Sequence, residues 1–109
     1  MKSFFFIALV LSSVLLYAQP ELGECDQEVE EIAKNQMPKA LKNWKSNQRE
    51  AERYLGKAVD MDPNYADALY LLGELYIRTY RLDKGAILWT KLLEVCPDYK
   101  AEVKYFLGS

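Results

Sequence analysis

The residue types that most often do chemistry in proteins are sparse in this sequence. The 109 residues include no histidine, which removes the commonest general base and a common metal ligand. The two cysteines, Cys25 and Cys96, lie too far apart for a zinc motif, and no glycine-rich loop follows an expected strand. Carboxylates such as Glu28, Glu30 and Glu31 are typical of a solvated helix face. We therefore expect no enzyme, no metal site and no cofactor.

The first 18 residues have the pattern of a secretory signal peptide. Lys2 is a short basic segment, residues 4–17 are apolar apart from two serines, and Ala18 is a small residue suited to the position before a cleavage site. A membrane anchor is the alternative, but this apolar run is shorter than the roughly 20 residues that a spanning helix needs. We expect export, no transmembrane segment in the mature chain, and a polar lead over residues 19–26.

The charge balance argues against a nucleic-acid partner. The chain has 14 basic and 16 acidic residues, and the expected leader contains one of the basic residues and none of the acidic ones. The two signs are interspersed without a basic run. Nucleic-acid binding needs a concentrated positive face.

The elements that would position functional residues are all expected to be helices, because every apolar periodicity is near 3.6 residues. Residues 66–97 are typical of two amphipathic helices, and the gap over 78–81 is so short that they must form an antiparallel hairpin. Residues 27–44 indicate one kinked helix, or two helices with Pro38 in the first turn of the second.

Turn and cap residues mark the other helices. Asn47 and Glu50 resemble a capping box at the start of a helix over about 48–61. The segment Asp62-Pro63-Asn64 is expected to end that helix and to cap the next one. A last helix, capped by Asp98, is expected to carry Val103, Phe106 and Leu107.

The hairpin pattern recurs with a period of 34 residues, the distance from Pro63 to Pro97. The motif is Leu69-x2-Leu72-Gly73-x2-Tyr76, then Gly85-x3-Trp89, then Pro97. It resembles the tetratricopeptide repeat, TPR, whose pattern is Trp-x2-Leu-Gly-x2-Tyr, Ala-x3-Phe and Pro. The resemblance covers about residues 27–107 and departs at Leu69 and Gly85.

This resemblance implies an all-α fold in which antiparallel hairpins stack as a short right-handed solenoid of about five helices. Two hairpins would occupy residues 27–99, the first one degenerate, and residues 100–109 would begin a third repeat or form a terminal cap helix. We expect alanine at Gly85 to be tolerated, because the family has alanine there. The residues assigned to the repeat core are Leu69, Leu72, Gly73, Tyr76, Gly85, Trp89, Leu92 and Pro97.

In TPR proteins the first helices of the hairpins line a concave groove. The groove candidates here are Asp67, Tyr70, Glu74, Ile77 and Arg78, which could hold an extended or helical peptide. Alternatively, Tyr70 and Ile77 pack against the neighbouring first helix. A clamp for a C-terminal carboxylate is disfavoured, because its Lys and Asn are absent at the matching places.

The two cysteines have only each other as partners. In a stacked array, the starts of first helices and the ends of second helices share one rim, so Cys25 and Cys96 belong on the same rim. An oxidising compartment permits a bridge between them. The sequence is compatible with a disulfide between the two cysteines and with two separate thiols.

These features predict a non-catalytic scaffold in the bacterial cell envelope, periplasmic or outer-membrane associated, with a protein or peptide partner. The leader, the lead, two hairpins and the Cys-Pro-Asp-Tyr segment resemble the N-terminus of envelope proteins in which TPR repeats precede a β-propeller and an OmpA-like domain. Peptidoglycan association would then come only from downstream domains that this sequence does not contain. We expect a longer chain; the alternative is a small exported TPR adaptor or chaperone.

Overall fold

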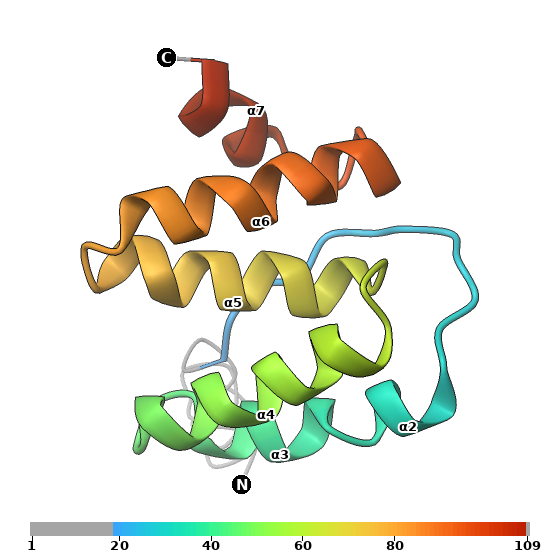
Figure 1. Ribbon diagram of the computed structural model, residues 1–109, viewed down its shortest axis with the longest axis vertical. Helices are drawn as coiled ribbons and strands as arrows, with labels where there is room; N and C mark the ends of the chain where they lie inside the picture. Colours follow the sequence, from blue (N-terminus) through green and yellow to red (C-terminus); the bar gives the residue numbers. More distant parts are fainter. Residues whose placement is uncertain (1–18, 109) are drawn as a thin grey trace, which may run out of the picture.

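The computed structural model describes residues 19–108, so the expected signal peptide lies outside the described residues. Within this part of the chain there are helices and no strand, and each helix packs against the next one (Figure 1). The helices are α2 (Glu31–Lys34), α3 (Met37–Asn43), α4 (Gln48–Met61), α5 (Ala66–Arg78), α6 (Leu82–Val95) and α7 (Ala101–Gly108). The all-α prediction is confirmed, and the array is the helical-repeat architecture that the sequence resembles.

Helix α5 is the centre of the core. It lies between α4 and α6, and its sequence ADALYLLGELYIR is buried on nearly every side. Leu69, Leu71 and Leu75 expose 1% or less of their surface. A helix of 13 residues with so wide an apolar face must be covered by more than one neighbour. The hairpins therefore share one continuous core rather than two separate ones.

Two glycines bring α5 and α6 together. A Cβ on Gly73 would lie 2.3 Å from the indole of Trp89, and a Cβ on Gly85 would lie 2.6 Å from Ile77 Cγ1 and 3.0 Å from the carbonyl oxygen of Gly73. Both glycines therefore act as packing notches. Alanine at Gly85, which the sequence predicts to be tolerated, would require Ile77 to shift, because its Cγ1 atom occupies the space that the methyl group needs.

The other residues assigned to the repeat core differ in burial. Leu69, Leu72, Trp89 and Leu92 are buried. Tyr76 is only half-buried, and the guanidinium of Arg81 lies 4.6 Å from its ring centroid. Pro97 is exposed, so it follows the end of α6 without joining the core.

The α5–α6 hairpin closes through a left-handed residue at its turn. Tyr80 has φ of 62°, and its N–H donates to the carbonyl oxygen of Ile77 at 3.1 Å. The N–H of Arg81 donates to the carbonyl oxygen of Tyr76 at 2.7 Å. These two bonds form a Schellman motif. Glycine usually occupies the left-handed position of this motif, where this chain has Tyr80. The tyrosine side chain is 89% exposed.

The first hairpin departs from the sequence prediction at its start. Helix is expected from residue 27, but residues 27–30 are extended and α2 begins at Glu31. The two-helix alternative is correct: the chain turns at Asn35 and Gln36, and Pro38 lies in the first turn of α3, where its missing N–H leaves no broken bond. The predicted cap of α4 is confirmed, since Asn47 Oδ1 accepts from the N–H of Glu50 at 3.2 Å.

Candidate functional site

Contacts between first helices define one face of the array. The Tyr70 hydroxyl of α5 donates to Glu102 of α7, and the Tyr99 hydroxyl donates to Asp67 of α5 at 2.6 Å. At the other end of α5, the guanidinium of Arg78 lies 5.2 Å from the ring centroid of Trp44, which follows α3. Helices α3, α5 and α7 thus adjoin along this face, which we call the first-helix face.

Tyr70 does not offer a free surface on that face. It is 3% exposed, its ring stacks on Trp89 at 5.6 Å between centroids, and Tyr99 lies against it at 5.3 Å. Burial, and then the bond to Glu102, raise the pKa of Tyr70 far above its ordinary value. The Tyr70 ring therefore packs mainly on α6 and on the turn before α7. Only its hydroxyl reaches the neighbouring first helix, α7, so neither sequence interpretation describes Tyr70 fully.

The other four groove candidates lie in different surroundings. Asp67 accepts the bond from Tyr99, and burial followed by this bond raises the pKa of Tyr99. Ile77 is half-buried and fills the notch at Gly85, so it packs on α6 rather than on a first helix. Arg78 is exposed beside Trp44. The five candidates therefore do not form one continuous open groove.

Glu74 is the unusual group on the first-helix face. Its Oε2 atom is buried and has no hydrogen-bond partner among the described residues. Desolvation raises the pKa of this carboxyl group, and the repulsion from Glu102 adds to it, while Arg78 and Lys100 oppose the shift. One oxygen of the Glu74 carboxyl group thus lacks a donor within residues 19–108, which is unfavourable in a folded protein.

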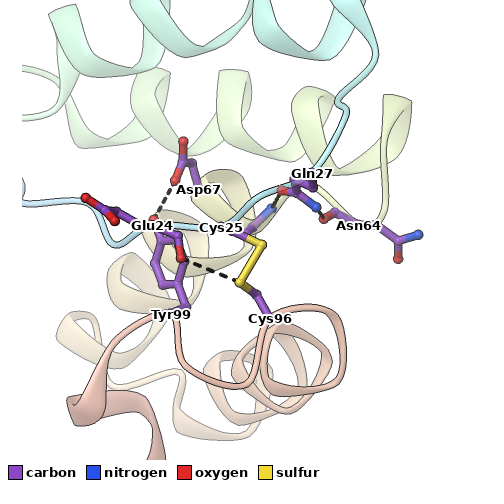
Figure 2. The surroundings of a disulfide bond; sticks show 8 residues. Glu24, Cys25, Gln27, Asn64, Asp67, Cys96 and Tyr99 are labelled. Carbon is purple, nitrogen blue, oxygen red and sulfur yellow. Dashed lines mark hydrogen bonds between the residues drawn. A yellow bond between two sulfur atoms is a disulfide. The ribbon is translucent and has the colours of Figure 1, made fainter.

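The N-terminal segment, residues 19–30, crosses the array before α2 begins. In Figure 1 this segment passes behind α5 and then curves in a wide loop to α2. Cys25 and Cys96 form a disulfide, with their Cα atoms 6.0 Å apart (Figure 2). The structure therefore joins the segment before the first helix to the end of α6, on the rim where the sequence places both cysteines.

Gln27 supplies the cap of α5 that the sequence assigns to the preceding turn. Its Oε1 atom accepts from the N–H of Ala66 at 2.8 Å, and its Nε2 atom donates to the carbonyl oxygen of Asn64 at 2.7 Å. Asp62 instead accepts from the backbone N–H of Asn64 at 3.0 Å and of Glu30 at 3.1 Å. A residue 39 positions away thus satisfies the first orphan donor of the central helix.

Gly23 passes so close to the turn before α7 that no side chain fits. A Cβ there would lie 2.1 Å from the carbonyl oxygen of Tyr99 and 2.9 Å from the Lys100 side chain. Two residues before Gly23, the Glu21 carbonyl oxygen accepts a hydrogen bond from Lys100 Nζ at 2.9 Å. Lys100 also lies 5.0 Å from the ring centroid of Tyr70, so the segment reaches the first-helix face.

Sequence reasoning missed Gln27 and Gly23, although a signal was present. From 23 to 30 the residues alternate, with inward positions partly buried and outward positions exposed. A period of two indicates extended chain rather than helix. The inward residues are Gly23, Cys25, Gln27 and Val29, and the outward ones are Glu24, Asp26, Glu28 and Glu30.

Two other surfaces complete the described part of the molecule. On the α3–α4 hairpin, Lys39, Arg53 and Lys57 lie within 5.7 Å of the ring centroid of Tyr54. A hollow of about 740 Å³ that is open to solvent is lined by residues 23–27, Val29, Lys34, Tyr65 and Asp67. Across residues 19–108 no cluster of His, Cys, Asp and Glu is arranged to hold a metal ion. None of the helices there is both long and apolar enough to cross a membrane.

Antiparallel helical hairpins stacked so that each repeat packs on its neighbouring repeats define a helical-repeat protein. The family model of the tetratricopeptide repeat matches residues 47–107, more than half of the chain. This chain belongs to the tetratricopeptide repeat family, whose members are generally non-catalytic scaffolds for protein–protein interaction. A search of curated proteins finds no match.

Proposed function

We propose that this protein is a non-catalytic TPR module that works after export to the bacterial cell envelope and binds a segment of a protein partner. The observation that carries the proposal is a TPR array closed by the disulfide Cys25–Cys96. Disulfides persist in oxidising compartments and are rare in a reducing cytosol. The signal-peptide pattern of residues 1–18 supports the same location.

Export is tested with a reporter that is active only outside the cytoplasm. The full sequence and a version without residues 1–18 are each fused to a periplasmic phosphatase reporter in a Gram-negative host. Activity with the full sequence alone supports export. Equal activity with both versions, or none with either, contradicts it.

Partner binding is tested by site-specific photo-cross-linking in cells of the native host. A photoreactive amino acid replaces Arg78 on the first-helix face or, as control, Ile87, which is 69% exposed on α6. A discrete cross-linked protein seen at position 78 and absent at position 87 supports an interaction module. Identical products at both positions argue for random collision.

The finer form of the proposal concerns the whole protein. The resemblance supports an N-terminal region of a larger envelope protein that ends in an OmpA-like peptidoglycan-binding domain. Sequencing the coding region beyond Ser109 tests this form. A frame that continues into strand-rich sequence supports it, whereas a stop codon favours a stand-alone adaptor or chaperone.

A further inference from the structure

The N-terminal segment consists of two parts that the array holds differently. Residues 25–30 are fixed by the disulfide, by both amide atoms of Gln27 and by the bond from the Glu30 N–H to Asp62. Residues 19–24 are held by the bond from Lys100 to the Glu21 carbonyl oxygen, by the close pass of Gly23 against Tyr99, and by a bond between the Gly23 backbone and the Tyr99 hydroxyl.

Little apolar surface is buried by residues 19–24. The side chains of Gln19, Glu21, Leu22 and Glu24 are exposed, and Leu22 is 37% exposed. Segments with few buried contacts open locally at a small fraction of the global unfolding free energy. The disulfide between Cys25 and Cys96 lies directly after this stretch (Figure 2). It would keep the rest of the segment in place while residues 19–24 move away.

We propose that residues 19–24 form a displaceable flap, hinged at the disulfide, over the first-helix face of α5 and α7, and that an extended, basic segment of a protein partner takes its place. This proposal rests on the function proposed above and specifies the chemistry of the partner. The flap is an extended chain already docked on this face, so it shows the form of ligand that the face accepts.

Lys100 determines how the backbone of such a segment is bound. Its ammonium group lies between the Glu21 carbonyl oxygen at 2.9 Å and the Glu102 carboxylate at 3.4 Å, above the ring of Tyr70. When the flap leaves, Lys100 loses the carbonyl partner. A carbonyl oxygen from an incoming extended chain restores that bond without any rearrangement of α7.

Glu74 determines the charge of the preferred segment. Its buried Oε2 atom lacks a donor among the described residues, and it follows Tyr70 by four positions on α5, so the two lie on one helix face. The flap sequence QPELGE has no basic residue and two carboxylates, so it adds no positive charge to Arg78 and Lys100, the two cations that already act on Glu74. A partner lysine or arginine can form a charge-assisted bond there, which is how a partner displaces the flap.

The test uses matched glycine substitutions in a chain that begins at Gln19 and keeps its disulfide. Gly23→Ala forces the flap away, because the new Cβ meets the backbone of Tyr99. Gly56→Ala is the control, because a Cβ at that position on α4 meets nothing within 4 Å. A phage-displayed library of decapeptides is selected on the Gly23→Ala protein, and the recovered peptides are synthesised for fluorescence anisotropy.

The expected peptides carry a lysine or arginine and bind Gly23→Ala about tenfold or more tightly than the wild-type or Gly56→Ala chains, since a closed flap reduces the binding-competent fraction. Adding Glu74→Gln should weaken binding to Gly23→Ala at least tenfold. Circular dichroism and intact mass verify folding and the disulfide. If Gly23→Ala does not fold, a chain that begins at Cys25 lacks the flap and should show the same tighter binding.

Two results would overturn the flap. One is a set of peptides that bind all three chains equally and are insensitive to Glu74→Gln. The other is a library that yields no binder to the flap-free chains. Neither result decides the interaction function, because cross-linking at position 78 against position 87 reports on that function independently.

Discussion

The array is closed in two places by different means. The α5–α6 hairpin is closed by residues near each other in sequence: Gly73 receives the Trp89 ring, and Tyr80 turns the chain. The N-terminal closure joins residues far apart, through the bond between Cys25 and Cys96 and the reach of Gln27 to α5. The hairpin needs its small residues in order to pack, whereas the N-terminal closure holds an irregular segment in place through a covalent bond and the polar contacts of Gln27.

The largest effect is expected from breaking the N-terminal closure. Replacing both cysteines by serine removes a cross-link between residues 71 positions apart and should lower the unfolding free energy by about 4 kcal/mol. Urea unfolding measures the loss. Reductant should destabilise the wild-type chain by a similar amount and leave the double variant unchanged; a double variant as stable as the oxidised chain would show that this closure contributes nothing.

A single methyl group added at Gly73 or Gly85 is expected to disrupt the packing of α5 against α6. Gly73→Ala should lower stability by about 1–3 kcal/mol, because its Cβ overlaps the buried Trp89 ring. Gly85→Ala should lower it less, since Ile77 is half-buried and can shift. Gly56→Ala should raise stability by up to about 1 kcal/mol through helix propensity alone. Thermal unfolding ranks the three variants, and any other order contradicts the notch assignment.

The cap at Gln27 separates the covalent part of the N-terminal closure from its polar part. Gln27→Ala should lower stability by about 1 kcal/mol, because the N–H of Ala66 loses its acceptor. Gln27→Glu keeps that acceptor at the N-terminus of α5, where a negative charge is favourable, but sets a carboxylate oxygen against the Asn64 carbonyl oxygen. It should still lower stability less than alanine, because the N–H of Ala66 keeps its acceptor. Urea unfolding at pH 7 compares the two variants, and equal losses would mean that the cap is not the relevant contact.

A substitution at the turn between α5 and α6 should increase the stability of the chain rather than lower it. Tyr80→Gly should raise stability by about 1 kcal/mol, because it removes a Cβ from a left-handed residue whose ring packs against little. Tyr80→Ala keeps the Cβ and should give no gain. Differential scanning calorimetry of both variants is the measurement, and a gain with alanine would place the strain elsewhere.

The smallest effect concerns pH and the first-helix face between the two closures. Glu74 has its pKa raised above the ordinary value of 4.5, chiefly by desolvation, so the folded chain holds this proton more tightly than the unfolded chain. Its contribution to stability is therefore complete below pH 4.5 and declines as pH rises through the folded pKa. Glu74→Gln should be more stable than wild type at pH 7, and the difference should shrink toward pH 4. Urea titrations at several pH values test this, and a constant difference would exclude titration of Glu74 as the cause.

The fold was predictable from the sequence to the level of the helices and their order. The 3.6-residue periodicity, the Pro63–Pro97 spacing and the Leu-Gly-Tyr pattern each act over a few helical turns, so a single sequence displays them. The predicted start of the first helix was wrong by four residues. The alternation of residues 23–30 favours extended chain only if another surface of the protein covers one side of that segment.

The candidate site was predictable only in part. Tyr70 carries the same apolar signal whether it lines a groove or stacks on Trp89, and the choice depends on Tyr99 and Glu102, about 30 residues away. Gln27 is an ordinary polar residue until folding places the start of α5 beside it.

The sequence by itself determined that the chain is helical, that it repeats, and which small residues lie where two helices approach. These properties depend on local periodicity and side-chain volume. Only the tertiary structure decided that an extended N-terminal segment crosses the first-helix face, that Gln27 caps α5, and that Glu74 is left without a donor. Those features depend on contacts between residues far apart in the sequence. The local sequence around each of these residues does not indicate which distant residue it contacts in the folded chain.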